Sequence, residues 1–311
     1  MPETGEVTHD EGGALDVVVH HRVMTRYLDW IREQTGDTYA GQGSLTGDWL
    51  APQKTSAQLM SDVYYGYVAR LMGQMARAIG RTADGEAYER LFARIKQAFI
   101  TKYLSTEGGR VTVGFLGVNV LAPVLTDEGR ADLAYKLLHQ DALPSWLYSV
   151  KNGATTVWER WNSYSEDDGF GPVSMNSFNH YAYGAIMEWM YAYMAGIARD
   201  PDSPGFKRFV LRPHIDPTGG ITQVAASFES PYGEIRSEWA VDDGGRTLMY
   251  DAVVPANSEA TLRLPAVSAD AVREGRTPLA RVDGVRFLGH ADGVSTYRMP
   301  SGRYHLTARL H

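Results

Sequence analysis

The chain has 311 residues, a formal net charge of -7 at pH 7 and a pI near 5.7. Because it is acidic and has no run of Lys or Arg, it lacks the basic surface of a nucleic-acid-binding protein, and we expect no nucleic-acid partner. The absence of cysteine excludes disulfides, thiol catalysis and thiolate metal sites. A neutral substrate and a two-domain chain fit these properties.

Residues 1–13 are polar and Gly-rich, which predicts a disordered leader. They contain no apolar stretch of the signal-peptide type, and no later run is long enough to span a membrane. We therefore expect a soluble chain without a membrane partner. Its compartment stays open, with the cytoplasm favoured.

Helical spacing of apolar residues predicts a helical domain over residues 14–205. Its expected helices cover residues 14–34, 55–80, 86–103, 126–139 and 178–198, with Thr55 and Ser177 as N-caps of the second and the last. The helices 55–80 and 86–103 form a hairpin. The face expected to be buried on the helix 55–80 consists of Tyr64, Tyr67, Val68, Leu71 and Met75.

The pattern changes at Asp200–Gly205, where two prolines and a glycine mark a domain boundary. Beyond it, apolar and polar residues alternate, and β-branched residues become common. Residues 206–311 are therefore predicted to form a C-terminal antiparallel β-sandwich. The expected strands are 207–212, 222–229, 233–241, 247–254, 259–264, 280–282 and 302–308.

The main chemical motif is N-G-A-T-T-V-W-E-R-W, residues 152–161, in which Glu159 lies between Trp158 and Trp161. Flat indole rings pack against the apolar faces of sugars, and a carboxylate acts as acid, base or nucleophile at a glycosidic bond. The alternative is that both Trp residues are buried core residues and that Glu159 is ion-paired with Arg160.

A second polar group follows in S-M-N-S-F-N-H-Y-A-Y-G, where His180 has Asn176 and Asn179 beside it. These side chains are suited to hydrogen bonds with sugar hydroxyls, although a histidine at a helix start is often structural. A Gly-rich loop carries a third candidate, Gly47-Asp48-Trp49, for which the alternative is a turn residue and a cover over the core.

The sequence resembles the catalytic and C-terminal parts of bacterial α-L-rhamnosidases. The strings that carry the resemblance are T-T-V-W-E-R-W, N-S-F-N-H-Y-A-Y-G-A-I-M-E-W-M-Y, P-G-F-K-R-F-V-L-R-P and S-P-Y-G-E-I-R-S-E-W, and they occur in the order found in that family. The resemblance covers roughly Asp29 to the C-terminus. It implies an (α/α)6 barrel followed by a β-sandwich.

The resemblance also implies an inverting glycoside hydrolase that removes terminal α-L-rhamnose. Glu159 matches the general base and His180 the pocket histidine, while Asp48 and Trp49 match a loop that lines the sugar pocket. Trp158, Trp161 and Asn179 complete the expected sugar contacts. The substrate would be a rhamnose-containing small molecule or oligosaccharide, and we expect no metal and no other cofactor.

The chain departs from the family in two ways. The family's general acid is the Glu of a D-E-R-x-G-W-type string upstream of the G-D-W loop, and this string is absent; His9-Asp10-Glu11 is the nearest approximation. About six helices are found where the barrel requires twelve, and a helical hairpin is missing after the turn 105–110. An incomplete barrel exposes apolar faces, which predicts a homo-oligomer or a partner that supplies the missing helices.

Two other functions are compatible with these residues. One is a catalytically impaired remnant of the family, which binds carbohydrate or has a structural role. The other is a different (α/α)6 sugar enzyme, such as a glucuronyl hydrolase or a lyase, which the acidic charge disfavours. The acidic run Glu166-Asp167-Asp168 is interpreted as a solvated turn rather than a cation site.

Overall fold

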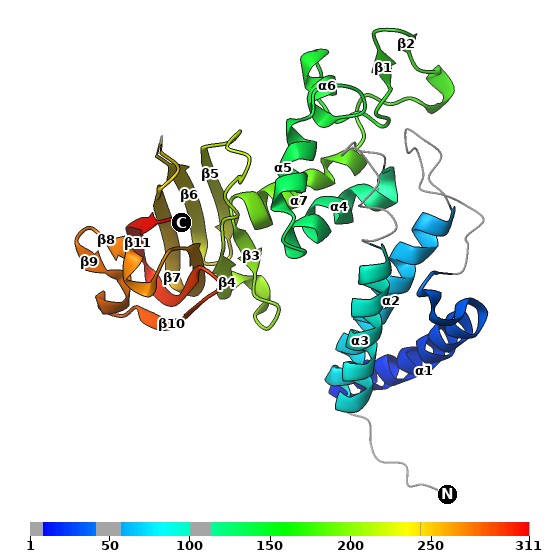
Figure 1. The fold of residues 1–311 in the computed structure, drawn as a ribbon, viewed down its shortest axis with the longest axis horizontal. Coiled ribbons are helices and arrows are strands. Elements are labelled where there is room, and N and C mark those ends of the chain that lie inside the picture. Colours follow the sequence, from blue (N-terminus) through cyan, green and yellow to red (C-terminus); the bar gives the residue numbers. More distant parts are fainter. Residues whose placement is uncertain (1–8, 42–56, 100–112, 243, 311) are drawn as a thin grey trace, which may run out of the picture. The chain divides into compact units, whose positions relative to one another are not determined.

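The computed structural model describes residues 9–41, 57–99, 113–242 and 244–310 (Figure 1). Asp48, Trp49, the expected cap Thr55 and the turn 105–110 lie outside the described residues. The chain divides into two compact units, residues 1–116 and 117–311, and each is described by itself.

The first unit is helical. Its elements are α1 (His9–Thr35), η1 (Gly36–Thr38), α2 (Ala57–Ala78) and α3 (Thr82–Phe99). The helix α1 begins at His9, inside the segment 1–13 that the sequence predicts as a leader. The expected hairpin of α2 and α3 is present.

The face of α2 that packs on the core only partly matches the predicted one, because Val68 and Met75 pack against the core cluster but the two predicted tyrosines are exposed. Tyr64 and Tyr67 are 45% and 52% exposed, whereas Tyr65 and Met72 are buried. The buried positions are spaced by three or four residues, as one helical face requires. The cluster contains Leu28, Ile31, Tyr65, Ala69, Met72 and Ile95.

The turn between α2 and α3 is explained by Gly80, which has a φ of +75°. The Arg81 amide donates to the Ala76 carbonyl at 2.7 Å, and the Gly80 amide donates to Arg77 at 3.0 Å. A residue with positive φ just past the helix end allows these bonds to satisfy the last carbonyls, and glycine adopts that conformation without a steric cost.

The second unit contains α4 (Phe115–Asp127) from Gly117 onward, then α5 (Ala131–His139) and α6 (Trp146–Lys151). The single helix predicted over 126–139 is wrong in its extent, because α4 ends at Asp127 and Gly129, with a φ of +74°, turns the chain into α5. Residues 115–125 of α4 were not expected to be helical, and the helix contains Pro123.

The last expected helix, 178–198, is also shorter and irregular. The 3-10 turn η4 (Ala182–Ala185) leads into α7 (Ile186–Trp189) and then into the π-helical turn η5 (Met190–Met194). Ser177 does not cap it, because the first helical turn begins at Ala182 with Tyr181 in the cap position; the Ser177 hydroxyl accepts a hydrogen bond from the Asn179 amide at 3.1 Å in a separate local turn. The wider π turn ends the helix before Gly196, where the chain enters the sheet.

The C-terminal part is one hydrogen-bonded set of nine strands (Figure 1). It starts at β3 (Ile197–Arg199), before the boundary expected at 205, because β3 already pairs with β4 (Arg208–Leu211). The pairing of β4 with β7 is parallel, so the prediction of a purely antiparallel domain is wrong on this point. The remaining strands are β5 (Gln223–Ser230), β6 (Gly233–Val241), β7 (Thr247–Pro265), β8 (Val272–Glu274), β9 (Thr277–Pro278), β10 (Arg286–Ala291) and β11 (Val294–Arg309).

The strands β7 and β11 are long because each contributes to two sets of neighbours. The first half of β7 pairs with β6 and its second half with β4, while β11 pairs with β10 through its first half and with β8 through its second. The β7–β11 register shifts between Pro300 and Gly302. Side chains from both halves, among them Tyr250 and Leu262, share one buried core.

Two expected strands merge into β7, and the expected strand 280–282 is wrong. Residues 279–281 form a 3-10 turn, η8, in which the Val282 amide donates to Leu279 at 3.1 Å. The strands β3, β8, β9 and β10 and the first half of β11 were not predicted.

Direct hydrogen bonds join the helices of the second unit to the sheet. The Trp239 indole donates to the Met194 carbonyl at 2.8 Å, and the Ser237 hydroxyl donates to Ala195 at 2.5 Å. Gly196 lies against the chain after β4, where a Cβ would be only 2.2 Å from the Pro213 nitrogen. These contacts fix the end of the helical segment on the sheet.

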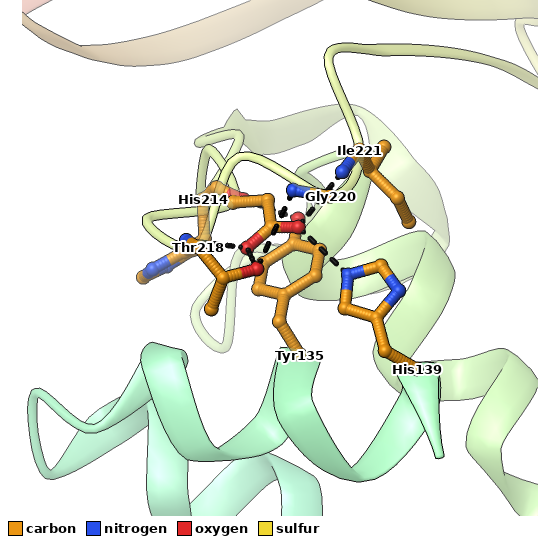
Figure 2. A network of polar contacts seen from close by, with 7 residues as sticks. Tyr135, His139, His214, Thr218, Gly220 and Ile221 are labelled. Carbon is orange, nitrogen blue, oxygen red and sulfur yellow. Dashed lines mark hydrogen bonds and ion pairs between the residues drawn. The ribbon is translucent and has the colours of Figure 1, made fainter. Parts of the chain in front are cut away.

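A polar network around Asp216 makes a second junction between α5 and the segment after β4 (Figure 2). The Asp216 carboxylate accepts bonds from the Thr218 amide and hydroxyl at 2.8 and 2.7 Å, and from the Ile221 amide at 2.9 Å. His139 of α5 approaches it to 2.9 Å, and the Tyr135 hydroxyl donates to the His214 carbonyl at 2.6 Å.

Among the described helices, none combines the length and the apolar character needed to cross a membrane.

Candidate functional site

The central motif follows α6, which has well-defined ends. The buried Ser145 hydroxyl accepts a bond from the Tyr148 amide at 3.0 Å and so caps the N-terminus. At the other end, Gly153 has a φ of +81°, and the Ala154 amide donates to Ser149 at 3.0 Å. The chain therefore leaves α6 in a fixed direction and enters the segment that carries Trp158 and Glu159.

Glu159 is held by the segment 177–180. Its amide donates to the Ser177 carbonyl at 2.8 Å, and its carboxylate accepts a bond from the Ser177 amide at 2.7 Å. A further backbone bond, from His180 to Val157 at 2.8 Å, continues this pairing. Within the described part of the chain Glu159 makes no ion pair, so the alternative of a pair with Arg160 is not what the structure contains.

The two indoles beside Glu159 have different surroundings. Trp158 is 7% exposed and packs edge-on against Phe178 with ring centroids 5.3 Å apart. Trp161 is 3% exposed and packs between Trp146, at 5.1 Å, and Tyr183, at 4.0 Å. Trp158 reaches a cavity, whereas Trp161 fills the core behind the motif.

The cavity at Trp158 has a volume of about 540 Å³. It is lined by residues from three stretches of the chain, none of which bears a charged side chain: Asn152, Gly153, Ala154, Thr155, Thr156, Trp158, Tyr164, Phe170 and Phe178. Neither Glu159 nor His180 belongs to its lining. We call it the Trp158 pocket.

His180 lies close to the Glu159 segment but makes its own contacts. Its Nδ1 accepts a bond from the Ala182 amide at 3.3 Å, and its ring stacks on the exposed Tyr181 at 5.1 Å. Asn179 is exposed, and its amide donates to the Ser177 hydroxyl. Asn176 donates from its side chain to the Ser163 carbonyl at 2.9 Å, which ties the two motif segments together.

The acidic run 166–168 forms the turn of a small hairpin between β1 (Tyr164–Ser165) and β2 (Gly169–Phe170). The Ser165 hydroxyl accepts a bond from the Asp168 amide at 3.0 Å. All three acidic residues are exposed at this turn. The hairpin places Tyr164 and Phe170 opposite each other at one wall of the Trp158 pocket.

The structure thus brings Trp158, Glu159, Asn179 and His180 into one neighbourhood, through the pairing of residues 157–159 with 177–180. Asp48 and Trp49 are outside the described residues. Sequence reasoning missed Ser177 as the donor to Glu159, and it missed the aromatic residues Tyr164, Phe170 and Phe178. Their spacing from Trp158 gives no periodic signal, because a turn and a hairpin bring them together.

Comparison with known proteins identifies both domains. The family model described as the bacterial alpha-L-rhamnosidase 6 hairpin glycosidase domain matches residues 17–112 and 105–194. The model of the bacterial alpha-L-rhamnosidase C-terminal domain matches residues 196–277. The two matches meet next to Gly196, where β3 begins, and they confirm the predicted order of a helical domain and a β domain.

Two curated α-L-rhamnosidases are similar to the chain. The protein from Streptomyces avermitilis is 34% identical over 320 residues, which cover 89% of this chain and 30% of the relative. One from Formosa agariphila is 33% identical and covers 86% and 31%. The chain therefore spans about a third of the length of these relatives. The alignment with the Streptomyces avermitilis protein spans 320 residues, more than the 311 residues of this chain. Within the aligned region, the relative therefore contains residues that have no counterpart in this chain.

The helical family model matches in two parts that overlap at residues 105–112, and the expected absence of a hairpin after the turn 105–110 stays a prediction. Solved structures support the fold. A crystal structure of the Streptomyces avermitilis α-L-rhamnosidase complexed with L-rhamnose aligns with a TM-score of 0.69 and 31% identity, over 96% of this chain and 31% of that one. That of an α-L-rhamnosidase from Dictyoglomus thermophilum aligns with a TM-score of 0.66 at 23% identity, a likeness in fold. The chain belongs to the bacterial α-L-rhamnosidase family, with parts of its 6-hairpin glycosidase domain and of its C-terminal domain.

Proposed function

We propose that this chain acts in the hydrolysis of terminal α-L-rhamnosides, with inversion at the anomeric carbon and Glu159 as the general base. The observation that carries the proposal is the state of the Glu159 carboxylate. It is half-buried, makes no ion pair among the described residues, and is fixed by the Ser177 amide at 2.7 Å. One carboxylate oxygen is thus oriented by the backbone, which leaves the other available to hold a water molecule.

The chemistry needs an ionised carboxylate that removes a proton from that water as it attacks the anomeric carbon. His180 and Asn179, which follow Ser177 directly, supply hydrogen-bonding groups for sugar hydroxyls, and Asp48 and Trp49 are proposed to complete the sugar contacts. The substrate class rests on the family and on the relative from Streptomyces avermitilis, whose crystal structure contains L-rhamnose.

Inversion requires a second carboxyl, roughly 6.5–9.5 Å from the base, that protonates the leaving oxygen. Within the described residues, the Trp158 pocket next to Glu159 has no carboxylate in its lining. We therefore assign only the base from this chain. Since protonation matters less for a good leaving group, an aryl α-L-rhamnoside is the substrate of choice for the first assay.

The test compares wild-type protein with Glu159→Gln, using 4-nitrophenyl α-L-rhamnoside. We expect the substitution to lower kcat by a factor on the order of 10²–10⁴, as for the loss of a general base. Glu166→Gln is the matched control, because it makes the same chemical change at an exposed turn. NMR of the first product formed should show β-L-rhamnose.

Turnover that survives Glu159→Gln would contradict the assignment of the base. An absence of turnover in the wild-type protein, together with measurable binding of rhamnose, would instead indicate the catalytically impaired, carbohydrate-binding form of the family.

A further inference from the structure

The aromatic residues of the Trp158 pocket form a continuous series. Trp158 contacts Phe178 with ring centroids 5.3 Å apart, Phe178 contacts Phe170 at 5.8 Å, and Phe170 contacts Tyr164 at 5.2 Å. Phe170, the third ring of this series, has 75% of its surface exposed. An exposed phenyl ring beside a cavity is available to a ligand, because its face is not used by the core.

The hairpin that carries Phe170 is well supported. Its two strands pair Tyr164 with Phe170, and its turn is closed by the two hydrogen bonds between Ser165 and Asp168. The Glu166 amide also donates to the Tyr148 hydroxyl at 3.0 Å, which attaches the hairpin to α6. The ring is therefore presented in a fixed position, and little conformational entropy would be lost when a ligand packs against it.

The lining selects the class of ligand. Among the described residues, the lining combines aromatic rings with the polar side chains of Asn152, Thr155 and Thr156 and includes no charged group. A sugar ring offers C–H faces that pack on aromatic rings and hydroxyls that bond to amides and hydroxyls. The lack of charge disfavours uronates and phosphates, and a cavity of about 540 Å³ is within the usual range for small-ligand sites.

Glu159 does not line this pocket, but residues close to it on both paired chain segments do. Trp158 precedes Glu159, and Phe178 follows the Ser177 that holds its carboxylate. A ring bound wholly inside the pocket would not contact Glu159, so the ring that is hydrolysed must lie elsewhere. We propose that the Trp158 pocket binds a second neutral sugar ring of the substrate, next to the ring on which Glu159 acts.

This inference rests on the proposed function for the identity of the first ring. Its test uses binding, measured by calorimetry in the Glu159→Gln background so that ligands are not turned over. The two ligands are methyl α-L-rhamnoside, which has one ring, and a disaccharide of α-L-rhamnose linked to glucose. The disaccharide should bind more tightly.

Phe170→Ala in the same background should weaken disaccharide binding roughly tenfold more than it weakens binding of the one-ring ligand, through loss of the stacking contact. Phe287→Ala is the control, since Phe287 is a partly exposed aromatic residue of β10 and lies outside the pocket. It should change neither affinity.

An equal effect of Phe170→Ala on both ligands, or no effect on either, would overturn the second-ring site. The proposed function would still stand if the wild-type protein releases rhamnose from the aryl glycoside. Conversely, a disaccharide preference that Phe170→Ala removes would support the site even if the wild-type protein had no hydrolytic activity. Failure of both ligands to bind would overturn the site.

Discussion

His139 Nε2 lies 2.9 Å from Asp216 Oδ2, and this contact connects the helix α5 to the segment that follows β4. The two side chains differ in environment, because that of Asp216 is fully buried and that of His139 is 33% exposed. The Asp216 carboxylate also accepts three bonds, two from Thr218 and one from the Ile221 amide, so it is the centre of this network. These hydrogen bonds lower the pKa of Asp216 against the opposing effect of its burial.

Because Asp216 is fully buried and His139 is partly exposed, replacing each should lower the free energy of unfolding by a different amount. Asp216→Ala should lower the free energy of unfolding by about 3 kcal/mol, since it leaves several buried donors unpaired. His139→Ala should cost about 1 kcal/mol, because the carboxylate keeps its other three donors. Urea unfolding at pH 7 measures both, and equal losses for the two variants would contradict this account of the network.

Gly220 allows His139 to approach the carboxylate. A Cβ at this position would lie 2.6 Å from His139 Nε2, which is the end of a movable side chain. Gly220→Ala should therefore displace the imidazole and cause the same loss as that expected for His139→Ala, about 1 kcal/mol. Combining the two substitutions should cost little more than either one, whereas full additivity in a double-mutant cycle would show that Gly220 acts independently of His139.

The lowered pKa of His214 predicts that the free energy of unfolding depends on pH. Burial, with a smaller effect of Arg212, lowers its pKa from 6.5 to about 4. The unfolded chain therefore binds a proton that the folded chain does not, and stability falls as the pH drops from about 6.5 to about 4. The full effect is about 3 kcal/mol.

His214→Gln should flatten this part of the pH profile of urea unfolding. His305→Gln, at a histidine whose side chain is 80% exposed, should leave it unchanged. The lowered pKa of Asp216 acts in a separate window, below its ordinary value of 3.8, where protonation of the carboxylate removes stability. A profile of His214→Gln identical to that of the wild-type protein would exclude His214 as the source.

Trp161 and Trp158 should respond differently to substitution. Trp161 fills the space between Trp146 and Tyr183, so Trp161→Phe should lower the free energy of unfolding by about 2 kcal/mol through the cavity it leaves. The affinity of the folded protein for rhamnose should stay the same. Trp30→Phe, at an indole that is 44% exposed, is a control for the chemical change. A lower sugar affinity with unchanged stability would restore Trp161 to the sugar contacts that the sequence predicts.

The spacing of apolar residues in the sequence located those helices and strands that bury one face against a single neighbouring layer of the fold. Alternation located β5, β6 and the first half of β7, and the hairpin of α2 and α3 followed from helical spacing. The prediction failed where the structure depends on distant partners. The helix at 186–194 widens to a π turn before Gly196, where a φ of +82° and the close approach of the chain at Pro213 both require glycine.

At the candidate site, too, some features followed from the sequence and others did not. The strings around Glu159 and His180 indicated the family, and the structure places the two residues in paired segments. The roles of Glu159, His180, Asn179, Asp48 and Trp49 stay predictions. Residue types alone did not separate Trp158, which lines a cavity, from Trp161, which does not, because the difference depends on a hairpin formed later in the chain.

The shared strands β7 and β11 also determine how the C-terminal domain comes apart. Each runs through both halves of the sheet, so neither half can detach while the other keeps its hydrogen bonds intact. A partly folded form with only one half in place would have to end both strands in their middle, at Pro255 and Pro300, and expose the interior. We therefore expect this domain to melt as a single cooperative unit.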